Sequence, residues 1–145
     1  MVEYLKKIID VESPIHIDLA ARRLTHAAGL TRVGNRINAA VKRACQYGNK
    51  INIFVFDGIS LTGNNLFDIA IRDRSNVSEY TKDPNLISPI EIVACAKKRC
   101  AGAIKPNYSE LIPIMCRDFG FKRATAEMKS FFKKTIEAAI KNNKW

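Results

Sequence analysis

Residues 18–47 read DLAARRLTHAAGLTRVGNRINAAVKRACQY, and this stretch decides the expected fold. Asp18 is a suitable N-cap for a helix ending near Ala28, because a short polar side chain satisfies the free amides of a first turn. Gly29 then permits the left-handed backbone with which helices commonly end. A second helix is expected at 32–47, where apolar side chains recur at helical spacing. The stretch therefore predicts a helix-turn-helix.

The residues on either side complete the order of elements found in winged-helix domains. Residues 2–11 have helical apolar spacing, and residues 15–17 are typical of an extended segment. Residues 51–56 and 67–71 are expected to be strands, with turn chemistry between them. These strands would form a β-hairpin, the wing. We expect three phenylalanines of the hairpin to pack in the core, with stacking on bases as the alternative: Phe54, Phe56 and Phe67.

The second half of the chain repeats the first at an offset of 91 residues. Gly29-Leu30-Thr31-Arg32 matches Gly120-Phe121-Lys122-Arg123, and each tetrapeptide lies between two expected helices. Ser13-Pro14 and Ser88-Pro89 are interpreted as opening the two halves alike. The helices of the second half are expected at 88–103, 108–119 and 123–142, after a polar linker at 73–87.

The predicted fold class is α+β, mostly α, with tandem winged-helix or helix-turn-helix-like repeats and one small β-hairpin wing. Residues 1–80 would form the first winged-helix-like unit with the hairpin. Residues 81–145 would form the second, helical helix-turn-helix-like unit.

Charge points to a polyanionic partner. The chain carries 24 Lys and Arg against 14 Asp and Glu, a formal net charge of +10. No acid lies between Asp18 and Asp57, whereas a solvated helix face usually mixes both signs. Such an excess suits nucleic acid, which releases counterions when cations bind its phosphates. A basic surface without a ligand is the alternative.

Two cationic helix faces are the candidate nucleic-acid-binding sites. In the first half, three arginines fall within about 40° on a helical wheel, with Asn35 beside them: Arg32, Arg36 and Arg43. In the second half, three lysines do the same, and Arg123 and Lys134 widen the patch: Lys122, Lys129 and Lys133. Arginine forks read guanine edges, whereas lysines mostly hold phosphate. A solvated cationic face is the alternative for each helix.

Arg72 and Arg74 follow the second expected strand, where arginines of a wing would reach a neighbouring groove. A local salt bridge with Asp73 is an equally good interpretation of this pair.

No chemistry beyond binding is visible. The four cysteines lack metal-ligand spacing and are interpreted as small buried hydrophobic residues: Cys45, Cys95, Cys100 and Cys116. No catalytic triad, carboxylate pair or phosphate loop occurs, so we expect no enzyme, no cofactor and no metal. No signal peptide or membrane span is predicted, and a cytoplasmic location is the default expectation.

Several segments, in order, resemble an uncharacterised domain near the C-terminus of large bacterial helicase-like proteins. They are 11–16 (VESPIH), 21–24 (ARRL), 29–37 (GLTRVGNRI), 71–75 (IRDRS), 87–92 (ISPIEI) and 120–123 (GFKR). The chain has Glu12-Ser13 where that family has Glu-Gly. The resemblance implies a parent protein with a superfamily-one helicase core and often a restriction-endonuclease-like domain, in some cases linked to defence against foreign DNA.

We therefore expect a non-catalytic accessory module that binds nucleic acid, preferably duplex DNA, beside the helicase and nuclease domains of a parent chain. The alternative is a protein–protein docking module within a larger helicase-like assembly. A third, weaker option is an enzyme with an unrecognised metal site.

Overall fold

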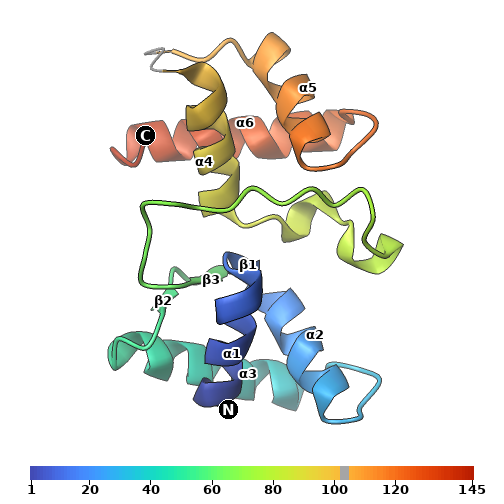
Figure 1. Cartoon of the computed structure of the whole chain (residues 1–145), viewed down its shortest axis with the longest axis vertical. Helices are drawn as coiled ribbons and strands as arrows, with labels where there is room; N and C mark the ends of the chain where they lie inside the picture. The colour runs from blue at the N-terminus through green and yellow to red at the C-terminus, as the bar shows by residue number, and fades with distance from the viewer. Residues whose placement is uncertain (102–104) are drawn as a thin grey trace. The chain divides into compact units, whose positions relative to one another are not determined.

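The computed structural model describes residues 1–101 and 105–145, which are mostly helical with a small antiparallel sheet (Figure 1). This confirms the predicted α+β, mostly α, class. The chain divides into a first unit, Met1–Ile69, and a second unit, Ala70–Trp145. The expected helix end at residue 103 lies outside the described residues.

The first unit contains three helices: α1 (Val2–Glu12), α2 (Ile17–Ala27) and α3 (Asn35–Lys50). The cap of α2 is His16, whose Nδ1 accepts a hydrogen bond from the Asp18 amide at 3.2 Å. The prediction of Asp18 as the cap is therefore wrong by two residues. His16 takes this role because it is extended, as its pairing with Ser60 in the sheet requires.

The turn between α2 and α3 is longer than predicted. Gly29 ends α2 with a φ of +74°, in the left-handed region expected for this position. However, α3 begins at Asn35, because Gly34 is extended and forms the N-cap. Arg32 and Val33 therefore belong to the turn and not to the helix.

The sheet of the first unit has the order β1-β3-β2, all antiparallel. Its strands are β1 (Ile15–His16), β2 (Val55–Phe56) and β3 (Ser60–Thr62). The Asp57 carboxylate accepts hydrogen bonds from the amides of Ile59 and Ser60, which closes the hairpin directly after β2. The predicted strand at 67–71 is therefore absent, and Phe67 is fully exposed instead of buried.

The first predicted strand is also much shorter than expected. The helix α3 continues to Lys50, and Asn52 turns the chain with a φ of +57°. Phe54 is buried, as predicted, because its ring covers Gly48, where a Cβ atom would lie 2.2 Å from the ring. Only Val55 and Phe56 remain to pair with β3, and Phe56 is half-buried.

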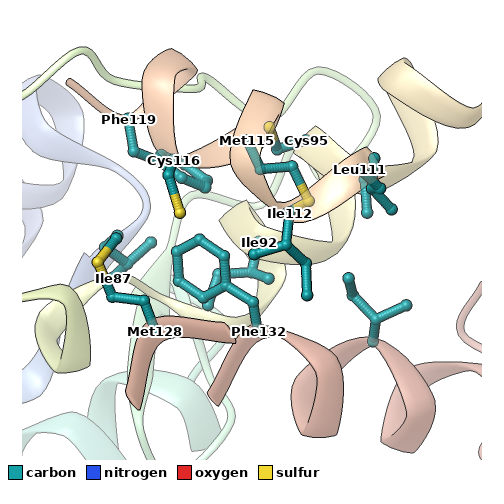
Figure 2. Packing of buried hydrophobic residues seen from close by; sticks show 12 residues of the cluster. Ile87, Ile92, Cys95, Leu111, Ile112, Met115, Cys116, Phe119, Met128 and Phe132 are labelled. Carbon is teal, nitrogen blue, oxygen red and sulfur yellow. The ribbon is translucent and has the colours of Figure 1, made fainter. Parts of the chain in front are cut away.

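The second unit contains α4 (Pro89–Cys100), α5 (Tyr108–Asp118) and α6 (Ala126–Lys141), preceded by the short 3-10 helices η1 (Glu79–Thr81) and η2 (Pro84–Leu86). Figure 2 shows the Phe132 ring pointing from α6 toward side chains of α4 and α5. The ring packs edge-on against Phe119, with centroids 5.6 Å apart. Thr125 caps α6 by accepting from the Met128 amide, so this helix starts three residues later than predicted.

Residues 70–75, which we call the strap, pack on the second unit. The Arg74 guanidinium is buried and donates to both oxygens of Glu91, at 3.0 and 2.7 Å, and the Glu91 side chain is fully buried. The Arg74 amide donates to the Phe119 carbonyl at 2.9 Å. These contacts tie the strap to α4 and to the end of α5. The unit boundary therefore falls after residue 69, whereas the sequence suggested residue 80.

The two units repeat the same helix pair. Both α2 and α5 have 11 residues, both α3 and α6 have 16, and each pair starts 91 positions apart. The turns also correspond: Leu30 donates to the Thr25 carbonyl, and Phe121 donates to the Cys116 carbonyl. The buried residues of α3 have buried counterparts at the same offset in α6: Val41 and Phe132, Cys45 and Ile136, Gly48 and Ala139.

The first helix of each unit follows a different offset. Leu5 and Ile9 of α1 correspond to Ile92 and Ala96 of α4, 87 positions later. Ser13-Pro14 follows α1, whereas Ser88-Pro89 begins α4. The expectation that these two dipeptides are equivalent is therefore wrong.

Candidate nucleic-acid interface

The outer side of α3 is cationic and free of acids. Arg36, Arg43 and Lys50 fall within about 40° on a helical wheel, opposite the buried Val41 and Cys45. Lys42 lies on the flank of the helix, about 80–120° from these three on the wheel, and all four cations are exposed. Within residues 1–101 and 105–145, no carboxylate lies within ion-pair distance of these four. We call these residues the α3 face: Arg36, Lys42, Arg43 and Lys50.

The structure changes the predicted arginine stripe at one end. Arg32 is exposed in the turn before α3, so it does not continue the helical line of Arg36 and Arg43. Asn35 is exposed and is the first residue of α3, in the position from which a recognition helix reaches base edges.

The predicted lysine stripe of the second unit is also rearranged. Lys122 and Arg123 are exposed but precede α6, because the helix starts at Ala126. Lys129 and Lys133 are exposed on the helix. The Lys133 ammonium lies 3.8 Å from Glu137 Oε1 and 5.5 Å from the centre of the Tyr108 ring, so it points toward α5.

The structural repeat identifies further cations. At the 91-residue offset, four basic positions of the first unit have basic counterparts in the second: Arg32 and Arg123, Lys42 and Lys133, Arg43 and Lys134, Lys50 and Lys141. The sequence reasoning left Lys42, Lys50 and Lys141 out of the candidate site. Extending the offset from the glycine turn along both helices would have found them.

Arg74 and Arg72 do not form part of a wing. Arg74 is buried against Glu91, and its guanidinium lies 5.6 Å from the centre of the Phe119 ring. The Arg72 amide donates to Glu91 Oε1 at 2.9 Å. The Asp73 carboxylate accepts hydrogen bonds from Ser75, and these hydrogen bonds lower the pKa of its carboxyl. Arg74 thus has a structural role in holding the strap, and the Arg72 amide contributes to the same hydrogen-bond network.

The cysteines occupy the interior. Cys45, Cys95 and Cys116 are buried, as predicted, and Cys100 is half-buried. Burial raises the thiol pKa of Cys45 and Cys95 to about 12 and that of Cys116 to about 11. Across the described residues, no group of His, Cys, Asp and Glu side chains is arranged to hold a metal ion.

These pKa values predict slow alkylation in the native protein. A pKa of about 12 for Cys45 lowers the thiolate fraction at pH 8 on the order of 1,000-fold relative to an exposed cysteine. We expect iodoacetamide to modify Cys100 first and Cys45 and Cys95 last, as followed by mass spectrometry at pH 8. Unfolding in urea should equalise the rates. Equal rates for Cys45 and Cys100 without urea would contradict this assignment.

The first unit also has a shallow apolar hollow between α1 and α2, with a volume of about 270 Å³. It is lined by Tyr4, Ile8, Val11, Leu24 and neighbouring polar residues, and Tyr4 and Val11 are largely exposed.

A family of unknown function, DUF3320, matches residues 1–39. The match spans α1, α2 and the first residues of α3, and it includes three of the segments that carry the resemblance noted above. The segments at 71–75, 87–92 and 120–123 lie outside it, so the expected coverage of nearly the whole chain is not shown. No curated protein and no solved structure matches the chain. Of the helices that the structure describes, none is both long and apolar enough to cross a membrane.

Proposed function

We propose that this chain is a non-catalytic nucleic-acid-binding module that contacts duplex DNA mainly through the α3 face. The observation that carries the proposal is the row of exposed cations on the side of α3 opposite the core, with no carboxylate among them. Such a row matches the phosphates of a duplex, because each cation that displaces a condensed counterion adds favourable free energy.

The position of α3 in the first unit supports the same conclusion. It follows α2 through a turn and precedes the β2–β3 hairpin, which is the order of a winged helix. In helix-turn-helix proteins the second helix of the pair enters the major groove, and its first residues reach the base edges. Asn35 and Arg36 occupy those first positions here, and both side chain types bind base edges.

The proposed setting is a helicase- or nuclease-type parent protein, in which the module would hold DNA near a catalytic domain. The support for this setting is the resemblance of residues 11–16, 21–24 and 29–37, all within the matched part of the chain.

A triple variant of the α3 face tests the proposal. Arg36→Ala, Arg43→Ala and Lys50→Ala together remove three candidate phosphate contacts. We expect weaker binding to a fluorescein-labelled DNA duplex, by about 10-fold or more near 100 mM salt, and a salt slope smaller by about 3. Fluorescence anisotropy titrations at several salt concentrations measure both quantities.

The matched control removes three exposed cations elsewhere: Lys97→Ala, Lys98→Ala and Lys105→Ala. We expect this control to change the salt slope by less than about 1, because it lowers net charge without removing the face. Equal losses in the two triple variants, both folded by a melting scan, would contradict the proposal. If the parent chain binds neither duplex DNA nor duplex RNA at low salt, the proposed nucleic-acid-binding function is refuted.

A second candidate function is protein docking, favoured by the hollow between α1 and α2 with its exposed Tyr4 and Val11. Tyr4→Ser with Val11→Ser should leave DNA binding unchanged under the main proposal, since neither residue lies on the α3 face. If docking is the function instead, the chain should associate with helicase or nuclease domains of a parent protein. The Tyr4→Ser and Val11→Ser variant should then abolish this association, and the α3 triple variant should leave it intact.

A further inference from the structure

The two cationic faces of the repeat are not equal, and the difference has a specific location. Residues 35–50 carry four basic and no acidic side chains, whereas residues 126–141 carry four basic and two acidic ones. The acids are Glu127 and Glu137. At the 91-residue offset they stand where α3 has Arg36 and Gln46.

Glu127 lies in the first turn of α6, on the side of the helix opposite the core. In α3, the line opposite the core consists of Arg36, Arg43 and Lys50; in α6, the same line consists of Glu127, Lys134 and Lys141. The line therefore begins with a cation, Arg36, in the first turn of α3, and with a carboxylate, Glu127, in the first turn of α6. A phosphate brought to this end of α6 would be repelled by Glu127.

Glu137 lies among the remaining lysines of α6. It is 3.8 Å from the Lys133 ammonium, which also lies over the Tyr108 ring. The counterpart of Lys133 is Lys42, and the counterparts of Glu137 and Tyr108 are Gln46 and Ile17. Lys42 therefore has neither a carboxylate nor an aromatic ring at these equivalent places, and it stays available to an external anion.

We propose that the α3 face provides the main duplex-DNA contact, that the equivalent face of α6 provides a weaker one, and that Glu127 and Glu137 set the difference. This inference rests on the proposed function. The two faces share basic residues at three equivalent helical positions, so both suit a phosphate backbone: Lys42 and Lys133, Arg43 and Lys134, Lys50 and Lys141. The acids of α6 weaken the second contact and thereby direct the duplex to the first unit.

An exchange of residues between the repeats tests this inference in the full chain. Glu127→Arg with Glu137→Gln gives α6 the α3 residue types. We expect duplex binding to tighten about fivefold or more near 100 mM salt, with a salt slope steeper by about 1. The reciprocal variant, Arg36→Glu with Gln46→Glu, gives α3 the acids of α6. We expect it to weaken binding by about 10-fold or more.

The control is Glu3→Arg with Glu110→Gln, which changes the net charge by the same amount at exposed positions of α1 and α5. Screening over a Debye length of about 10 Å should limit its effect to less than about twofold. All variants are first compared with the parent in a melting scan. If the Glu127→Arg variant does not fold, Glu127→Gln with Glu137→Gln takes its place, because it removes both acids without adding a cation, and it should also tighten binding.

The results separate this inference from the proposed function. If the parent chain does not bind duplex DNA, the proposed function fails and this inference with it. If the parent binds but Glu127→Arg with Glu137→Gln behaves like the Glu3 and Glu110 control, the proposed function stands and the inequality of the two faces is refuted.

Discussion

Replacing Arg74 by alanine is expected to lower the free energy of unfolding of the second unit by about 3–5 kcal/mol, because it leaves the buried Glu91 carboxylate without its main partner. Arg74 donates to both Glu91 oxygens and to the Arg72 carbonyl, and Glu91 has no exposed surface. Urea unfolding followed by circular dichroism measures the loss. The weaker approach of Arg72 to Glu91, at 3.8 Å, does not restore the paired geometry.

The control for this experiment is Arg99→Ala in the same unit. Arg99 also binds a carboxylate, with its Nε 2.7 Å from Asp118 Oδ2, but almost half of its side chain is exposed. Exposed ion pairs contribute little to stability, so this variant should unfold much closer to the parent than Arg74→Ala does. If Arg74→Ala costs no more than Arg99→Ala, the network around Glu91 does not hold the strap.

The second large effect is expected at a pair of equivalent glycines. Gly29 and Gly120 both end a helix with positive φ, +74° and +86°, so alanine at either position should cost about 1–2 kcal/mol in backbone strain. At Gly120 a Cβ would also lie 2.3 Å from the Ser75 amide nitrogen and 2.7 Å from that of Arg74. Displacing the strap should add about 1–3 kcal/mol, as overpacking does.

The comparison between these two variants isolates the strap, because no atom lies within 4 Å of a Cβ built at Gly29. Thermal unfolding of Gly29→Ala and Gly120→Ala, each against the parent, should show the larger loss for Gly120→Ala. Gly120→Ala combined with Ser75→Gly would retain the loss, since the nearest atom is the Ser75 backbone nitrogen, which Ser75→Gly does not remove. Equal losses at both glycines would show that the strap can move at no cost.

The sequence was sufficient to predict the helices and the class of fold. Both glycine turns were placed correctly because glycine in a left-handed C-terminal position is a local requirement. The strands were harder to predict. Alternation over 51–56 is typical of a strand, but a packing contact decided the outcome: Phe54 turns inward onto Gly48, and only two residues remain paired.

In the candidate site, too, features set by helical periodicity were predicted, and features set by contacts between distant residues were not. Arg36 and Arg43 were found on one side of α3 because helical periodicity places them there. Arg74 was misassigned because its partner, Glu91, lies 17 residues away in the chain. No sequence pattern near Arg74 predicts that the two side chains meet. Lys50 and Lys141 were left out because they lie at the far ends of the two helices, beyond the matching tetrapeptides at the glycine turns, although the 91-residue offset still relates them.

The strap has a consequence for how this chain can be divided. A fragment that starts at residue 81, where the polar sequence suggests a boundary, would lack Arg74 and leave Glu91 buried without its main counter-charge. A fragment that starts at residue 70 retains both. The fragment that can be transferred to another protein is therefore 70–145. A fusion that moves α4, α5 and α6 must include the strap as well.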